Sequence, residues 1–257
     1  MVKPNYIAMI DASNLKKETR YGLPAADQIL FNRHYVLGYS YYFRQAKWAL
    51  EIVDKDKTQI QRIENFRPDY RIPERFRADL ANYLNSGYDR GHLVSSANQI
   101  ETQLQNSETF LLSNMSPQNP SFNKGVWKRL ENAVRVLNET KNILETYVIS
   151  GPLFLFDQEV KVIESKKEEG VTLPIPHAYF KSVLTENHRG TLRIWSFIIP
   201  NEPIDLDDPK FEDGVLEHFQ VATTKIEKIS GLFLWESLVG TKITRDKKKI
   251  RKMWKYN

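Results

Sequence analysis

The sequence predicts an α+β fold, with a mixed, largely antiparallel sheet and packed helices. Three observations favour this class. Short segments rich in aromatic and β-branched residues recur along the 257 residues and are separated by turns or loops, as in a sheet. One central segment instead places its apolar residues at helical spacing. No repeat, Gly/Ser linker or change of composition divides the chain, so a single folded domain is the simpler interpretation.

The expected strands share this aromatic and β-branched composition. They cover residues 34–41, 48–53, 109–115, 147–154, 178–184, 192–199 and 220–223. Pro117 and Pro120 follow the third of them and are expected to end its pairing, because proline cannot donate to a strand ladder. Residues 54–87 are charged, irregular and interrupted by proline, which predicts a long loop with a short helix over 74–84.

The expected helix runs from Asn123 to about Thr140. Its apolar residues recur at intervals of three and four positions, at Val126, Leu130, Val134 and Leu137. The segment contains no proline, and its one glycine, Gly125, falls in the first turn. This spacing predicts one continuous amphipathic helix.

Composition excludes several classes of site. The chain has no cysteine, which removes disulfides, zinc-thiolate sites and cysteine nucleophiles. A bound metal would therefore have oxygen or imidazole ligands. The first residues contain no apolar stretch of signal-peptide length, and no later segment approaches the roughly 20 apolar residues of a membrane span. As written, the sequence predicts a cytoplasmic protein with no membrane partner.

Positive charge is concentrated at the C-terminus. The net charge is +5, and residues 242–257 alone carry eight Lys or Arg against one acid, so the rest of the chain carries a net −2. A nucleic-acid partner would have to be attracted by a local groove together with this tail. A solvated, frayed terminus is an equally good interpretation of the same residues.

The run Asp89-Arg90-Gly91-His92 contains the first candidate for chemistry. Histidine titrates near neutrality and is a natural base for taking a proton from water, and the preceding glycine allows a bend or the close approach of a substrate. A lone histidine after a glycine is more often an ordinary loop residue. The other residues of a site must therefore decide its role.

The expected helix offers three such residues. At about 100° per residue, Asn123, Glu131 and Arg135 fall along one flank of the apolar stripe. Asn and Glu oxygens are ligands suited to Mg²⁺, and an arginine can pair with phosphate oxygens. The alternatives are a surface ion pair between Glu131 and Arg135 and a simple helix cap at Asn123.

Three blocks of sequence in this order resemble the DNA/RNA non-specific endonucleases, the family of Serratia nuclease and endonuclease G. The blocks are Asp89-Arg90-Gly91-His92, the run from Thr109 to Gln118, and the run from Asn123 to Glu131. Further similarity extends over roughly residues 22–240. The resemblance implies a ββα-metal active site, and it divides the chain into an N-terminal extension at 1–21, an endonuclease domain at 22–240 and a basic tail at 241–257.

The resemblance also implies a role for each matching residue. His92 would be the general base, Asn123 the direct ligand of Mg²⁺, and Glu131 the group that holds a metal-bound water. Asn114 and Gln118 would support the site through hydrogen bonds. Phosphate would be contacted by Arg135, Arg90 and Arg62. Asp89 is expected to fix the local backbone or Arg90 and to perform no chemistry.

The expected reaction is metal-dependent, sequence-nonspecific hydrolysis of DNA and RNA, leaving 5′-phosphate and 3′-hydroxyl ends. Mg²⁺ is the expected cofactor and Mn²⁺ is an alternative. One competing hypothesis is a catalytically silent nucleic-acid-binding or assembly module on the same scaffold, and another is an exonuclease or a nuclease restricted to one nucleic acid. A nonspecific nuclease endangers its host, which favours one of three alternatives: a lost targeting segment, an inhibitor or regulatory partner, or activation by assembly. The family resemblance makes a homodimer an open alternative to a monomer.

Overall fold

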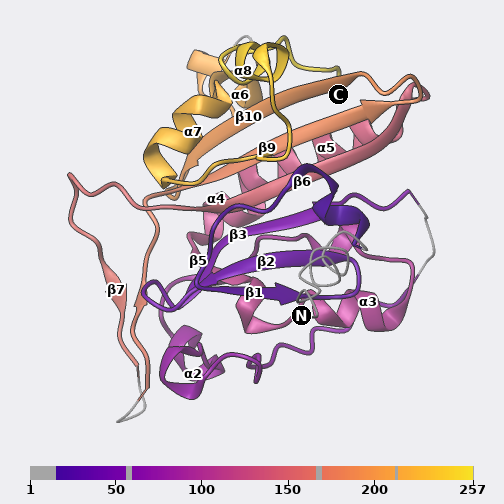
Figure 1. Cartoon of the computed structure of the whole chain (residues 1–257). Helices are drawn as coiled ribbons and strands as arrows, with labels where there is room; N and C mark the ends of the chain where they lie inside the picture. Colours follow the sequence, from indigo (N-terminus) through magenta and orange to yellow (C-terminus); the bar gives the residue numbers. More distant parts are fainter. Residues whose placement is uncertain (1–15, 56–59, 166–169, 212–213, 257) are drawn as a thin grey trace, which may run out of the picture.

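The computed structural model describes residues 16–55, 60–165, 170–211 and 214–256. Residues 1–15 of the expected N-terminal extension lie outside these ranges. The described residues form a seven-stranded sheet in the order β1-β2-β3-β6-β9-β10-β11, with every neighbouring pair antiparallel (Figure 1). Its strands are β1 (Gln28–Phe31), β2 (Tyr35–Ser40), β3 (Gln45–Ile52), β6 (Ile143–Leu153), β9 (Ala178–Asn187), β10 (Leu192–Pro200) and β11 (Gln220–Val221). The predicted α+β class with a largely antiparallel sheet is confirmed.

Both faces of the sheet are buried, which explains why its strands are apolar throughout. Successive side chains of a strand point to opposite faces. In β3, Ala49 belongs to the core on one face, whereas Trp48 and Leu50 belong to the core on the other. In β10, Phe197 and Ile194 are divided in the same way. The sheet is therefore the middle layer of three.

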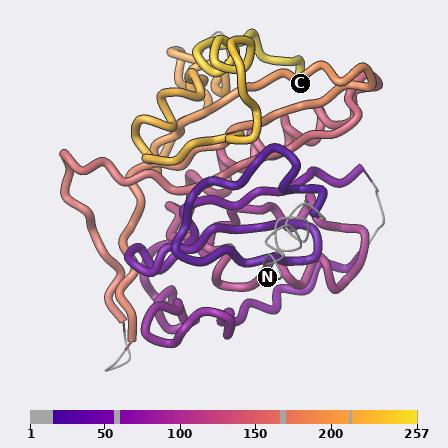
Figure 2. The backbone as a smooth tube through the Cα atoms, in the orientation of Figure 1, coloured from indigo at the N-terminus to yellow at the C-terminus, as the bar shows by residue number. Residues whose placement is uncertain are grey.

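Helices form the two outer layers. The helix α5 (Lys128–Asn138) packs against β6 on one face, and α7 (Thr223–Ser230) and α8 (Thr241–Lys247) pack against β10 on the other (Figure 1). The backbone trace in Figure 2 shows the C-terminal residues beside the last strands of the sheet. Shorter helical segments are η1 (Lys17–Tyr21), η2 (Glu74–Phe76), α2 (Leu80–Tyr83), η3 (Ser96–Asn98), α3 (Gln103–Glu108), η4 (Leu112–Asn114), α4 (Pro120–Phe122), η5 (Asn123–Trp127), η6 (Pro209–Phe211) and α6 (Val215–His218).

Two small sheets lie outside the main one. The first pairs β4 (Asp89–His92) with β5 (Met115–Gln118), and the second pairs β7 (Val162–Ile163) with β8 (Leu173–Pro174) in an arm that projects from the molecule (Figure 1). The pair β4-β5 is followed along the chain by α4, η5 and α5. This succession is the ββα unit that the family resemblance predicts.

The prediction of a strand over 109–115 is wrong for most of its length. Residues 112–114 form η4, and pairing begins only at Met115. The segment is apolar because it is a buried turn: the amide of Asn114 donates to the carbonyl of Thr109 at 2.9 Å. Pro117 lies inside β5 and does not end it. Its carbonyl accepts from Tyr179 and Asn201 and so points away from β4. The nitrogen of a strand residue points to the same side as its carbonyl, so no donor to β4 is needed at this position.

Residues 74–84 form two short helical turns instead of the single helix expected. The helix α2 begins only after Asp79, whose side chain accepts from the backbone N–H of Ala81. Asn82 completes the cap by accepting from the backbone N–H of Asp79. Such a capping box starts a new helix, and it therefore separates η2 from α2.

The C-terminal residues are docked on the domain, so the interpretation of a frayed terminus is wrong for 241–256. Lys247 is 4% exposed and bonds to Glu227 of α7. Beyond α8 the chain passes to the opposite face, where the indole N–H of Trp254 donates to the carbonyl of Ala133 in α5 at 2.7 Å. Met253 is buried in the same core. The tail thus connects the two helical layers.

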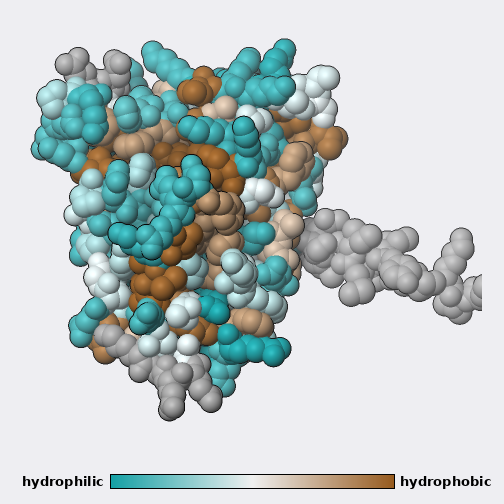
Figure 3. All heavy atoms as spheres, turned by 90° about the vertical axis from the view of Figure 1, so that its left-hand side faces the viewer, coloured by the Kyte–Doolittle hydropathy of each residue, from teal (hydrophilic) through white to brown (hydrophobic). Residues whose placement is uncertain are grey.

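Some hydrophobic residues remain on the surface. Figure 3 shows a band of them among hydrophilic residues, on the side of the molecule that lies at the left in Figure 1. Exposed large apolar side chains of the described residues include Tyr42, Phe156 and Phe233. Within the part of the chain that the structure describes, no helix is both long enough and apolar enough to span a membrane.

Candidate active site

His92 ends β4, where its backbone pairs with Met115 of β5. The residue before it must be glycine, because a Cβ at Gly91 would overlap the side chain of Gln118 in β5. The imidazole then lies edge-on to the ring of Phe110, with the ring centroids 5.0 Å apart, and 5.9 Å from the ring of Phe66. The strand pair therefore places this histidine in a largely aromatic setting.

This setting keeps His92 neutral. Burial, with a smaller contribution from the positive charge of Arg62, lowers the pKa of His92 to about 3. Its buried Nε2 has no hydrogen-bond partner among the described residues. A buried polar atom without a partner is uncommon in folded proteins. An unprotonated imidazole can accept a proton.

The expected continuous helix is interrupted, which corrects the prediction for 123–140. Asn123 lies in η5, and Glu131 and Arg135 lie in α5. Between them Gly125 adopts φ −96° and ψ −108°, which lie outside the helical region. Asn123 therefore does not share a helical register with Glu131. The two are brought to one cavity by the kink and by the indole N–H of Trp127, which donates to the carbonyl of His92 at 3.3 Å.

Asn123 is held by Asp89, a contact that was not predicted from the sequence. The amide nitrogen of Asn123 donates to Oδ2 of Asp89 at 2.9 Å, and Lys124 Nζ lies 3.5 Å from the same oxygen. A carboxylate can only accept, so it fixes which end of the amide faces it. The amide oxygen of Asn123 is consequently directed away from Asp89 and left for a ligand.

Glu131 is half-buried in α5 and accepts from the hydroxyl of Ser95 at 3.0 Å. Burial raises the pKa of Glu131, and the positive charges of Lys181 and Arg135 oppose this increase. Lys181 of β9 is 2% exposed, and its ammonium donates to the hydroxyl of Ser150 at 2.7 Å. A buried cation thus lies behind the carboxylate, a feature that the sequence pattern did not indicate.

Three arginines line the same cavity. Arg135 donates to the side-chain oxygen of Asn98 at 2.7 Å and also bonds to Asn132. The guanidinium carbon of Arg90 lies 4.1 Å from the ring centroid of Phe66, and that of Arg62 lies 5.3 Å from the ring centroid of Phe110. Stacking against aromatic rings keeps the charge of each group while ordering its side chain.

Asn114 and Gln118 are fully buried and lie behind the cavity. The amide of Asn114 donates to the carbonyl of Val94 and accepts from the N–H of the same residue, both at 3.0 Å, which holds the chain just after His92. Gln118 packs over Gly91, but neither of its amide atoms has a partner among the described residues. The expected supporting hydrogen bonds are therefore present for Asn114 and absent for Gln118 within that part of the chain.

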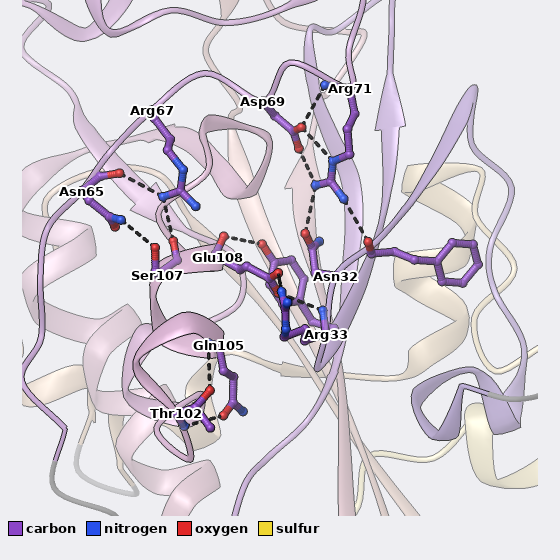
Figure 4. A network of polar contacts seen from close by, with 12 residues as sticks. Asn32, Arg33, Asn65, Arg67, Asp69, Arg71, Thr102, Gln105, Ser107 and Glu108 are labelled. Carbon is purple, nitrogen blue, oxygen red and sulfur yellow. Dashed lines mark hydrogen bonds and ion pairs between the residues drawn. The ribbon is translucent and has the colours of Figure 1, made fainter.

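The loop that carries Arg62 and Phe66 is anchored by polar contacts (Figure 4). Arg67 donates to the carbonyl of Ser107 at 3.0 Å, and the carboxylate of Asp69 accepts from Arg71 and from the hydroxyl of Ser113. Arg71 also donates to Asn32 at 2.9 Å, which connects the loop to the edge of the main sheet. These bonds fix a segment that has little regular secondary structure.

The site residues surround a cavity of about 860 Å³. Its lining includes His92, Asn123, Glu131 and the three arginines, together with Lys124 and Lys128. The described residues contain no group of three or more His, Cys, Asp or Glu side chains that could hold a metal by themselves. The amide oxygen of Asn123 and the carboxylate of Glu131, two residues that line this cavity, are ligand types suited to a hard cation such as Mg²⁺, which retains most of its water ligands. The residues present therefore fit a hydrated divalent metal.

Comparison with known proteins gives the family. The sequence model described as DNA/RNA non-specific endonuclease matches residues 14–240. A nuclease of Syncephalastrum racemosum is 33% identical over an alignment of 265 positions, which covers 94% of this chain and 77% of the relative. The mitochondrial endonuclease G of Homo sapiens is 34% identical over 227 residues, which cover 86% of this chain and 74% of the relative. The chain belongs to the DNA/RNA non-specific endonuclease family.

The solved structures agree with this assignment. A chain from the crystal structure of the EndoG/EndoGI complex, which concerns the mechanism of EndoG inhibition, matches with a TM-score of 0.77 and 31% identity. The match covers 88% of this chain and 93% of that one. This member of the family is accordingly a nuclease, and its family is one of metal-dependent enzymes. The docked C-terminal segment after residue 240 lies beyond the part that the family's sequence model matches.

Proposed function

We propose that this protein is a divalent-metal-dependent, sequence-nonspecific endonuclease that hydrolyses DNA and RNA to products with 5′-phosphate and 3′-hydroxyl ends. One observation supports this most directly. The neutral His92 and Asn123, whose amide nitrogen is bound to Asp89, line the same cavity. A base and a metal ligand at one cavity are the two requirements for metal-assisted hydrolysis of a phosphodiester.

In the proposed reaction His92 takes a proton from water as the water oxygen attacks phosphorus. The bond from phosphorus to the 3′-oxygen breaks, and that oxygen leaves and is protonated by solvent. Asn123 would hold Mg²⁺ directly, with Mn²⁺ as an alternative, and Glu131 would orient one of its water ligands. When bound, the ion would polarise the phosphate and stabilise the negative charge of the leaving oxygen. The negative phosphate itself favours the protonated imidazole that forms beside it.

The arginines would contact phosphate and not bases, which accounts for the lack of sequence preference. Five cationic side chains line the cavity, from Arg62, Arg90, Lys124, Lys128 and Arg135. They outnumber its three carboxylates, from Glu64, Asp89 and Glu131. A local excess of positive charge in a cavity attracts a polyanion even when the rest of the molecule is not basic.

The test is cleavage of supercoiled plasmid and of structured RNA with Mg²⁺, with Mn²⁺ and with a chelator. We expect loss of both substrates only with metal, and a loss of rate of at least about 100-fold in His92→Ala. His188→Ala is the matched control, because His188 is an exposed histidine outside the cavity. Product ends are identified by whether 5′ labelling requires prior phosphatase. Intact substrates with both metals would overturn the proposal, and tight binding without cleavage would favour the silent binding module.

We also propose a protein inhibitor as a partner. Support comes from the similar solved structure, in which EndoG is found with EndoGI. A homodimer stays a prediction that light scattering on the purified chain would test. A mass equal to one chain at all concentrations would exclude it.

A further inference from the structure

A buried carboxylate, that of Glu51, is separated from the cavity by a single residue. Glu51 of β3 is 1% exposed, and it is not among the residues that line the cavity. Its Oε1 accepts from the side-chain amide nitrogen of Asn98 at 3.0 Å, and its Oε2 accepts from that of Gln99 at 2.9 Å. Gln99 is fixed in turn, because its oxygen accepts from Gln105 at 2.8 Å. Both oxygens of Glu51 are thus committed to amide groups.

Asn98 connects this carboxylate to the cavity. Its nitrogen faces Glu51, and its oxygen accepts from Nη1 of Arg135 at 2.7 Å. An ionised carboxylate can only accept and a guanidinium can only donate, so each neighbour of Asn98 requires the amide end that it meets. The side-chain amide of Asn98 therefore has one fixed orientation between Glu51 and Arg135. If the amide turned over, its NH₂ group would face the guanidinium, and its oxygen would face the carboxylate.

We propose that Glu51 is a positioning residue for nucleic-acid cleavage, and that it acts through Asn98 to hold the guanidinium of Arg135 where a substrate phosphate binds. This inference rests on the proposed function, since it takes Arg135 as a phosphate contact. Arg135 is half-buried, and its second side-chain contact, Asn132, is exposed. The buried path through Asn98 is the one that can restrict the long side chain before substrate arrives.

The competing explanation is that Glu51 only balances the buried ammonium of Lys181. Removing Glu51 would then destabilise the protein and leave substrate binding intact in the molecules that remain folded. Under our proposal, substrate binding depends on which of the two side chains donates and which accepts in the Glu51–Asn98 hydrogen bond. The two explanations therefore predict different substrate binding when the carboxylate and the amide are exchanged between positions 51 and 98.

The experiment exchanges carboxylate and amide between the two positions. Glu51→Gln alone supplies only one acceptor oxygen for the two amides of Asn98 and Gln99. Asn98→Asp alone places two carboxylates against each other. In the double variant Glu51→Gln/Asn98→Asp, the amide at 51 donates to the carboxylate at 98 and still accepts from Gln99. The carboxylate at 98 keeps an oxygen for Arg135, and the net charge and side-chain sizes are unchanged.

We expect KM for an oligonucleotide substrate to rise about tenfold in each single variant, with a smaller change in kcat, and to return to within about twofold of wild type in the double variant. In an Arg135→Ala background, Glu51→Gln should cause no further rise in KM, because the group it positions is gone. Glu145→Gln is the matched control: Glu145 is another carboxylate only 9% exposed, bonded to Tyr147 and Lys17. We expect it to change urea stability without changing KM.

The outcomes separate this inference from the proposed function. A wild-type protein that cleaves no substrate would refute the function itself. If the wild type cleaves but Arg135→Ala or Glu51→Gln leaves KM unchanged, or if the double variant binds no better than the singles, the positioning role is overturned. Urea unfolding of every variant identifies any that do not fold. If a variant does not fold, Asn98→Ser takes its place, because it keeps Glu51 and removes the amide that joins Glu51 to Arg135. Its KM is then compared with and without Arg135→Ala.

Discussion

Substitution of Asp89 tests whether this carboxylate orients the side-chain amide of Asn123, the proposed metal ligand. In Asp89→Ala the amide nitrogen of Asn123 loses its acceptor at 2.9 Å, and the two orientations of that amide become similar in energy. A hydrogen bond to a charged acceptor contributes roughly 1.5 to 3 kcal/mol. In the wild type that energy keeps nearly all molecules with the amide oxygen toward the cavity. With the two orientations equally populated, about half of the molecules remain competent, which by itself weakens metal binding about twofold. Removing a group that orients a metal ligand also frees the ligand's geometry and typically weakens metal binding about 10 to 100-fold, so we expect a loss within that range.

The measurement is the initial rate of plasmid nicking as a function of Mg²⁺ concentration. We expect the half-saturating concentration to rise by that factor, and the rate at saturation to approach that of wild type. Lys124→Ala is the control, because Lys124 contacts the same carboxylate but its side chain is 73% exposed. A half-saturating concentration unchanged in Asp89→Ala would refute the orienting role of Asp89.

Three further predictions concern stability. Gly91→Ala should cost about 1 to 3 kcal/mol in urea unfolding, since the added Cβ overlaps Gln118; an unchanged midpoint would contradict this. The folded pKa of His92, about 3, lies below its unfolded value near 6.5, so its stabilisation is complete above pH 6.5 and falls as the pH drops toward 3. Between pH 7 and pH 4, His92→Asn should lose about 3 kcal/mol less stability than wild type, measured by urea midpoints, and parallel curves would exclude the shift. Trp254→Ala should lower Tm by about 4 to 8 °C, because the indole anchors the C-terminal segment to α5, whereas a frayed tail would leave Tm unchanged.

The main sheet could be predicted because its strands are buried on both faces. Continuous apolar composition identified β2, β3, β6, β9 and β10 to within a few residues. The same signal failed at 109–115, where the residues are apolar because they form a buried turn. Composition reports burial, and it does not distinguish a strand from a turn that lies in the core.

The candidate site was predictable in its residue types but not in its connections. Helical spacing placed Asn123 and Glu131 on one helix, although a glycine with non-helical dihedral angles separates them. The contacts of Asp89 with Asn123 and of Glu51 with Asn98 gave no signal, because each joins residues more than thirty positions apart in sequence. Such contacts depend on how β3, β4 and the kinked helix pack together. Local patterns carry no information about that packing.

Asp89 and Glu51 have the same physical role at two places, since each orients a side-chain amide. A side-chain amide has an acceptor at one end and donors at the other, and nothing in the amide itself decides which end faces a ligand. Asp89 meets the nitrogen of Asn123 and Glu51 meets the nitrogen of Asn98, so both amide oxygens are directed outward, one toward the cavity and one toward Arg135. The protein thereby presents amide oxygens of defined direction. Exchanging either carboxylate for an amide should therefore harm the site more than removing an exposed lysine that contributes full charge but no direction.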